Sequence, residues 1–258
     1  MKKLRIVIYG AVLCLALFGI AGNAMADDCT GGCGTSGANG VVGLSPTGNS
    51  TYQWVSTTGG ITGVGGIPVG PLQGNETDGS TFATSSFTVN ASSTLNFYFD
   101  YVTSDGSGFP DYAWAELFNG NGTPDALLFT AQTEPSGAIV PAPGLTQPDP
   151  SVTLNPSSVL ITPNATTWSP LGQWSGQCWA VGCGNTGWVD SNFVIPSAGT
   201  YYLEVGVVNA NDTLYDSGLA FDGVTINGQP ITPAPEPGTL PLMAFGMIGL
   251  VTTKLLKK

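Results

Sequence analysis

The sequence predicts an all-β protein whose body is a single jelly-roll-like or β-sandwich domain over residues 27–230. Three observations lead to this fold class. Glycine and proline are abundant, with 37 and 19 residues in a chain of 258, and only 9% of the residues are charged. Several segments alternate apolar and polar side chains with the period of two that a strand requires. No long helical period interrupts them, so short strands joined by turns are expected.

The clearest alternation covers residues 95–102, where Leu95, Phe97, Phe99 and Tyr101 share one face. Residues 112–118 continue the same pattern. Further strands are expected at 126–132, 192–196, 200–209 and 219–227, with a weaker pattern at 52–55. Residues 134–150 contain five prolines and predict an exposed loop instead of a strand.

The N-terminus has the pattern of a secretory signal peptide. A basic start precedes an apolar run over residues 6–20, and Ala24 and Ala26 flank Met25 as a small-x-small cleavage site. We therefore expect residues 1–26 to be removed after Ala26. The mature protein would then be exported across the inner membrane and begin at Asp27.

The C-terminus has three parts in a fixed order: Pro235-Glu236-Pro237, an apolar run over residues 239–253, and Lys254, Lys257 and Lys258. Two prolines two residues apart favour an extended segment. The apolar run is about 22 Å long as a helix, against a hydrocarbon core of about 30 Å, and snorkelling of Lys254 brings it close to spanning. The terminal lysines predict that this end stays in the cytoplasm.

This arrangement resembles the PEP-CTERM sorting signal, which covers about the last tenth of the chain. The resemblance implies recognition of Pro235, Glu236 and Pro237 by an exosortase-type membrane protease. It divides the end of the chain into a Pro-rich linker at 231–238 and a transmembrane helix with its basic tail at 239–258. The chain departs from the family pattern by having lysine only in the basic cluster and by placing Pro241 in the first helical turn.

The family's setting implies a protein that is transiently anchored in the membrane and then held at the cell surface or outside the cell. It further implies a structural or interaction role in an exopolysaccharide or biofilm matrix. The alternative reading of the same segment is a plain tail anchor that is never cut.

Charge is distributed in a way that excludes several classes of function. All six basic residues lie in the two terminal segments, and the chain has no histidine. The domain of residues 27–234 carries sixteen acids, the chain's seventeen less Glu236, and no positive side chain. Catalytic pairs that need His or Lys are excluded, as are zinc, copper or haem sites that need His. Nucleic acid is excluded as a partner because its affinity depends on Lys and Arg.

Four cysteines follow the signal peptide: Cys29, Cys33, Cys178 and Cys183. In an oxidising compartment an even number of cysteines predicts disulfides. The short spacings suit two local bridges, although two long-range bridges are equally allowed by the sequence. A four-thiolate zinc site is the alternative, but such sites usually have tighter spacing.

Two polar turns, at residues 103–111 and 209–218, interrupt the apolar alternation. Their side chains offer the oxygen ligands that calcium prefers, while the same residue types also form turns without any metal. No other cofactor is indicated. The candidate ligands for a structural calcium ion are Asp105, Asp111, Asp212, Asp216 and Asp222, the last of which lies within the final strand.

Two other patterns bear on function. Trp168, Trp174, Trp179 and Trp188 could stack on sugar rings, or they could fill a loop core around the second cysteine pair. A glycosidase would need a pair of carboxylates, for which Asp100, Glu116, Glu204 and Asp222 are the strand-borne candidates. We expect no enzyme, because any chain with sixteen acids offers such pairs. The leading hypothesis is a structural surface protein, the second is a calcium-dependent carbohydrate-binding module, and the third is a glycosidase-like enzyme.

The terminal segments predict the mass of the mature protein. The species recovered from the native host should begin at Asp27 and end near residues 235–237, as intact-mass spectrometry of membrane and medium fractions can determine. A species that ends at Lys258 and occurs only in membranes would contradict the sorting signal and indicate an uncut tail anchor.

Overall fold

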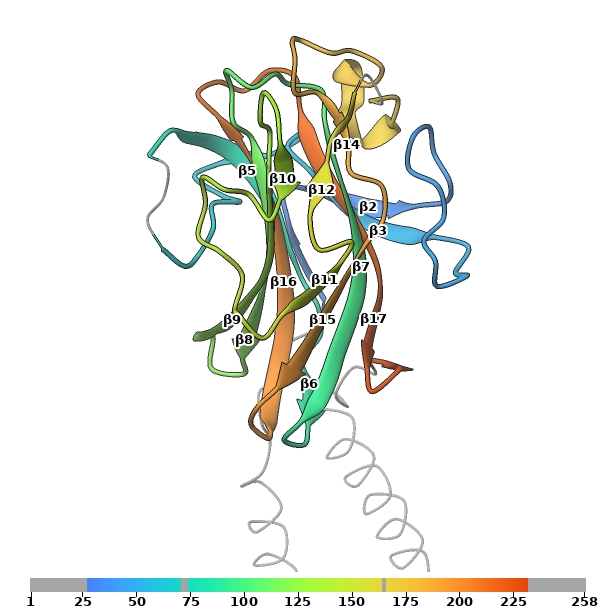
Figure 1. The fold of residues 1–258 in the computed structure, drawn as a ribbon, viewed down its shortest axis with the longest axis vertical. Coiled ribbons are helices and arrows are strands. Elements are labelled where there is room, and N and C mark those ends of the chain that lie inside the picture. Colours follow the sequence, from blue (N-terminus) through green and yellow to red (C-terminus); the bar gives the residue numbers. More distant parts are fainter. Residues whose placement is uncertain (1–26, 71–73, 164–165, 232–258) are drawn as a thin grey trace, which may run out of the picture. The chain divides into compact units, whose positions relative to one another are not determined.

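The computed structural model describes residues 27–70, 74–163 and 166–231, and these form two antiparallel sheets that pack face to face (Figure 1). The first sheet has the strand order β1-β5-β16-β8-β9, with β4 added on β5 and β6 on β16. Its strands are β1 (Asp28–Thr30), β4 (Ile61–Thr62), β5 (Glu76–Ala83), β6 (Phe87–Val89), β8 (Tyr112–Asn119), β9 (Pro124–Gln132) and β16 (Gly199–Ala210).

The second sheet has the order β11-β15-β7-β17-β3-β2, with β14 added on β7, β13 on β14 and β18 on β17. Its strands are β2 (Gly32–Ser36), β3 (Tyr52–Ser56), β7 (Ser93–Thr103), β11 (Thr153–Asn155), β13 (Thr162–Pro163), β14 (Gly184–Asn185), β15 (Val189–Ile195), β17 (Ser217–Ile226) and β18 (Gln229–Pro230). A separate pair joins β10 (Ala138–Val140) to β12 (Val159–Leu160), and a 3₁₀ segment, η2, spans Ser169–Trp174.

The predicted all-β sandwich is therefore confirmed, and so are its main strands. The segments expected at 52–55, 95–102, 112–118, 126–132, 192–196, 200–209 and 219–227 are β3, β7, β8, β9, β15, β16 and β17. Strand β5 was not predicted, because its sequence ETDGSTFA is mostly polar and carries no apolar alternation. Its place in the first sheet, between β1 and β16, comes from pairing with β16 along most of its length.

The core between the two sheets contains the predicted apolar face of β7. Leu95, Phe97, Phe99 and Tyr101 are fully buried there. Phe99 stacks on Phe129 of the facing sheet, with ring centroids 3.7 Å apart and planes 7° from parallel. Each such fully buried phenylalanine stabilises the fold by about 1.5–3 kcal/mol through removal of apolar surface from water.

A second apolar cluster covers the outer face of the first sheet. It contains Tyr112, Trp114 and Phe118 of β8, and loop residues lie over them. For this reason both faces of β8 are buried, although only one face packs against the second sheet. Trp114 donates a hydrogen bond of 2.7 Å from Nε1 to the carbonyl of Gly65 in one of the covering loops.

The prediction that residues 134–150 form an exposed loop is correct only in part: residues 135–137 and 143–144 are exposed, but the segment also contains β10 and several buried side chains. Ile139 and Val140 of β10 are fully buried in the inter-sheet core, and Ala142 and Leu145 are buried in the outer cluster. The prolines are compatible with strand β10 because the strand is only three residues long and Pro141 follows it directly. The segment is a packed cover of the first sheet.

The predicted disulfides are confirmed, and both are local. Cys29 pairs with Cys33 and Cys178 pairs with Cys183, with Cα atoms 6.2 and 5.6 Å apart. The long-range alternative and the four-thiolate zinc site are therefore wrong. Because β1 belongs to the first sheet and β2 to the second, the bridge between Cys29 and Cys33 links the two layers covalently.

The terminal predictions fall outside the described residues. They are the signal peptide of 1–26 with Ala24 and Ala26, the linker beyond residue 231 with Pro235, Glu236 and Pro237, and the helix and basic tail of 239–258. In the part of the chain that the structure describes, no helix is long and apolar enough to cross a membrane.

Several carboxyl groups are buried without any cationic side chain to pair with. Burial raises the pKa of Asp100 and of Asp105 to about 7. Burial, with a further contribution from the negative charge of Asp125, raises the pKa of Glu116 to about 8. These groups favour the protonated form in the fold, whereas the unfolded chain ionises them near pH 4.

We therefore expect the protein to lose stability as the pH rises from about 4 to about 8, because the unfolded state releases protons first. Glu116→Gln mimics the protonated carboxyl, so its Tm should exceed that of the wild type by about 5 °C at pH 8 and by less at pH 5. Thermal unfolding at the two pH values measures this. Asp149→Asn is the control of opposite sign, since hydrogen bonds from Ser151 lower the pKa of Asp149. A Glu116→Gln effect independent of pH would contradict the assignment.

Candidate functional site

The two polar turns of the sequence meet at one end of the sandwich. The first connects β7 to β8 and the second connects β16 to β17, so each passes from one sheet to the other. They lie side by side: the amide of Ser104 donates to the carbonyl of Asp216 at 3.2 Å, and Nδ2 of Asn211 donates to the carbonyl of Gly108 at 3.2 Å. We call residues 104–111 and 211–216 the crossover loops.

A third segment, which carries the second disulfide, packs onto the first crossover loop. The amide of Trp179 donates to the carbonyl of Ser104 at 3.0 Å, and the amide of Ser107 donates to the carbonyl of Val181 at 2.9 Å. Figure 1 shows this segment, coloured gold, at the upper end of the sandwich beside β14. The disulfide closes the chain around Trp179, which lies between its two cysteines.

Three aromatic rings from these segments form one surface, which we call the aromatic platform: Trp174, Trp179 and Tyr215. The ring of Tyr215 stacks on Trp174, with centroids 4.3 Å apart and planes at 29°. It also contacts Trp179 at a centroid distance of 5.1 Å. The side chain of Trp179 is 55% exposed, which is unusual for so large an apolar group. Tyr215 has a left-handed backbone with φ of 55°, a strained conformation that persists where the surroundings enforce it.

The four tryptophans of the segment 168–188 therefore divide into two pairs. Trp168 is fully buried and donates from Nε1 to the hydroxyl of Tyr52 at 2.9 Å. Trp188 packs beside Tyr52 and donates from Nε1 to the carbonyl of Gly43 at 3.1 Å. These two fill a loop core beside Tyr52, as the second interpretation of the cluster expected in part, while Trp174 and Trp179 lie at the loop end.

Of the five predicted calcium ligands, three have their oxygens occupied by donors of the protein. Asp111 accepts from the amide of Ala210 at 2.8 Å and from the hydroxyl of Ser217 at 2.7 Å. Asp216 accepts from the hydroxyls of Thr57, at 2.9 Å, and Thr58. Asp222 lies farther along β17, away from the crossover loops.

Asp105 and Asp212 remain as the two acids of the facing crossover loops. The negative charge of Asp212 contributes to the raised pKa of Asp105, after burial, and both charges contribute to the raised pKa of Asp111. The three carboxylates therefore share one neighbourhood. In the described residues no group of three or more Asp, Glu or Cys side chains converges closely enough to hold a metal by itself.

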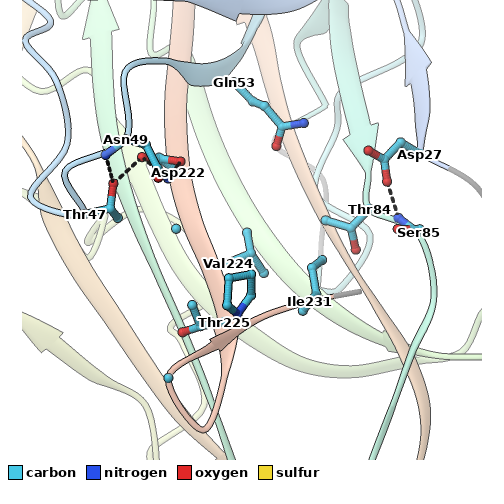
Figure 2. Close-up of a pocket in the computed structure, with 13 residues that line it drawn as sticks. Asp27, Thr47, Asn49, Gln53, Thr84, Ser85, Asp222, Val224, Thr225 and Ile231 are labelled. Atoms are coloured by element: carbon cyan, nitrogen blue, oxygen red, sulfur yellow. Dashed lines mark hydrogen bonds between the residues drawn. The ribbon is translucent and has the colours of Figure 1, made fainter. Parts of the chain in front are cut away.

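Asp222 borders a polar groove of about 410 Å³ on another part of the molecule (Figure 2). Oδ2 of Asp222 accepts hydrogen bonds from Ser45 and from Thr47, and Asn49 donates to Oδ1 at 3.0 Å. Gln53, Thr84 and Ser85 line the opposite wall, together with Asp27 and Ile231. The donors around Asp222 all come from one loop, so the carboxylate fastens that loop to β17.

The four strand-borne carboxylates that a glycosidase could use are divided between the two sheets. Glu116 and Glu204 are direct cross-strand partners on β8 and β16, and burial is the main cause of the raised pKa of each. The negative charge of Asp125 on β9 further raises the pKa of Glu116, and that of Asp28 on β1 further raises the pKa of Glu204. Asp100 lies in the other sheet, where Thr186 donates to it at 3.1 Å. The sequence identified the polar turns and the tryptophans separately, but not that they lie together at the loop end, because the three segments are far apart along the chain.

Comparison with known proteins identifies no family. No family model matches the chain, and no curated protein matches it. Similar solved structures include TmCBM61 in complex with β-1,4-galactotriose, at 7% identity and a TM-score of 0.34 over 78% of this chain and 88% of that one. The K1 cleaved adhesin domain of Lys-gingipain from Porphyromonas gingivalis W83 matches at 13% identity and a TM-score of 0.34, over 80% and 93%. The family 11 carbohydrate-binding module of Lic26A-Cel5E from Clostridium thermocellum matches at 12% identity and a TM-score of 0.17, over 74% and 91%.

These neighbours are carbohydrate-binding modules and an adhesin domain. Their low TM-scores and identities leave the ligand of the present chain to be argued from its own residues.

Proposed function

We propose that the domain is a non-catalytic binding module of an exported surface protein, and that it holds a neutral polysaccharide on the aromatic platform. The observation that carries this proposal is the exposure of Trp179 at the loop end, next to the stacked rings of Tyr215 and Trp174. An exposed aromatic group of this size on a soluble domain is usually part of a contact surface.

The chemistry around the platform suits a hydroxyl-rich ligand. Indole and phenol faces provide flat apolar surface for the C–H face of a sugar ring, while neighbouring amides and carboxylates can bond its hydroxyl groups. Asn211 is exposed and Asp212 is partly exposed on the adjacent crossover loop. Because residues 27–231 carry no positive side chain, an acidic polymer would be repelled. A neutral polysaccharide fits best.

Catalysis is the weaker candidate. A glycosidase needs two carboxyl groups that both reach the bond to be cleaved. Glu116 and Glu204 lie within the first sheet, where Glu116 is almost completely buried.

The terminal segments supply the proposed cellular setting. An exosortase-type protease would act at Pro235, Glu236 and Pro237 after the predicted helix has anchored the protein in the membrane. The released or surface-held domain would then contribute to an exopolysaccharide or biofilm matrix by binding the polysaccharide itself. A passive structural role in the same matrix is the alternative, and it requires no ligand at the platform.

Replacement of Trp179 by alanine tests the proposal. With the purified full-length protein and the native host's neutral exopolysaccharide, we expect Trp179→Ala to weaken binding about tenfold, which corresponds to about 1.4 kcal/mol. Trp174→Ala should act in the same direction. Titration followed by tryptophan fluorescence, and retention on immobilised polysaccharide, measure the change.

Gln53→Ala is the matched control because Gln53 lines the polar groove and not the platform. It should leave binding unchanged, and all variants should keep a cooperative thermal transition. Equal binding by Trp179→Ala and the wild type would show that the aromatic platform is not the binding site. Loss of binding in Gln53→Ala alone would move the site to the groove.

A further inference from the structure

The loop end that carries the aromatic platform has an excess of buried oxygens over hydrogen-bond donors. In the described residues, four buried side-chain oxygens have no hydrogen-bond partner, and they belong to Asn75, Asp105, Glu116 and Asn209. All except Glu116 lie at this end. Asn75 joins the second crossover loop, since its Nδ2 donates to Oδ1 of Asn211 at 2.9 Å and its carbonyl accepts from the amide of Asn211 at 2.8 Å.

Among the three residues at this end, Asp105 is the only acid, so leaving its oxygen without a partner costs the most free energy. Its side chain is 1% exposed. Oδ1 accepts the amide of Gly106 at 2.7 Å, while Oδ2 has no partner. A buried carboxylate oxygen is normally paired or bound to a metal ion. No cationic side chain exists in residues 27–231 to serve as that partner. The group must therefore either keep its proton or take a cation from solution.

Asp212 supplies a second carboxylate on the facing loop. Its Oδ1 accepts the amide of Leu214 at 2.9 Å, which fixes the orientation of the side chain. It is only partly buried, so an ion can reach it from solvent. The carboxylate of Asp111 lies in the same neighbourhood, but its two oxygens are already bonded to Ala210 and Ser217.

We propose that a calcium ion binds between Asp105 and Asp212 and joins the two crossover loops beneath the aromatic platform. The available ligands are oxygens, with no imidazole and no free thiolate among the described residues, and this selects a hard cation. Two carboxylates completed by amide oxygens, carbonyl oxygens and water suit calcium better than magnesium, because calcium accepts irregular geometry and a larger number of ligands.

The ion would fix the strained loop of Asn211 and Tyr215, both of which have left-handed backbones. Polysaccharide binding should then depend on calcium. This consequence rests on the proposed function, whereas the metal site itself does not.

The test uses calcium alone, without polysaccharide. The purified full-length protein is treated with chelator, dialysed, and unfolded thermally at pH 8 with and without millimolar calcium at constant ionic strength. We expect calcium to raise the Tm by about 5 °C. Asp105→Asn and Asp212→Asn should each abolish the rise. Asp222→Asn, which removes an acid at the polar groove, should keep it.

Terbium luminescence gives a second readout. Tb³⁺ excited through the nearby indoles should emit in the wild type, and calcium should displace it. The Asp212→Asn variant should give no such emission. This variant is a surface substitution, so it should fold even if Asp105→Asn does not. The site is overturned by an unchanged wild-type Tm, or by an equal rise in Asp105→Asn or Asp212→Asn, which would indicate general screening. Loss of the rise in Asp222→Asn would also overturn it, because the ion would then bind at the polar groove. Calcium binding without polysaccharide binding would refute the proposed function and leave the metal site standing.

Discussion

The absence of cationic side chains from the domain is the constraint on which the rest of the structure depends. Every buried carboxyl group must be accommodated by neutral donors or by protonation. Thr57 and Thr58 bond Asp216, Ser217 and Ala210 bond Asp111, and Thr186 bonds Asp100. The abundance of hydroxyl residues beside the acids therefore has a structural reason. Where the donors are too few, as at Asp105 and Glu116, the group either keeps its proton or needs a cation from solution.

Two of the loop segments of this protein are packed parts of the fold. Residues 138–145 complete both the inter-sheet core and the cluster on the outer face of the first sheet, and Trp168 anchors η2 against β3. Because both faces of the first sheet are covered, successive side chains of β8 are buried on one face or the other. The strand is therefore buried along nearly its whole length. Among the described residues, the large aromatic side chain that remains mostly exposed is Trp179, which lies at the loop end.

The sequence allowed the fold class and the main strands to be predicted, because the period of two in β7 follows directly from the burial of one face. It did not allow β5 to be predicted, since its position depends on pairing with β16 and not on its own side chains. Only part of the candidate site could be predicted from the sequence. The polar turns and the tryptophans were recognised separately, but nothing in a linear chain indicates that Tyr215 stacks between Trp174 and Trp179, or that only two of the four indoles are free of the loop core.

The bridge between Cys29 and Cys33 has a mechanical consequence. A pulling force applied to the chain at Asp27 first loads β1, which is held to β5 by only three residue pairs. The disulfide passes that load on to β2 and, through its pairing with β3, to the second sheet. The bridge limits how far β1 can move from β2 after its pairing with β5 is lost, so the first strand stays next to the domain and can pair again when the force is removed.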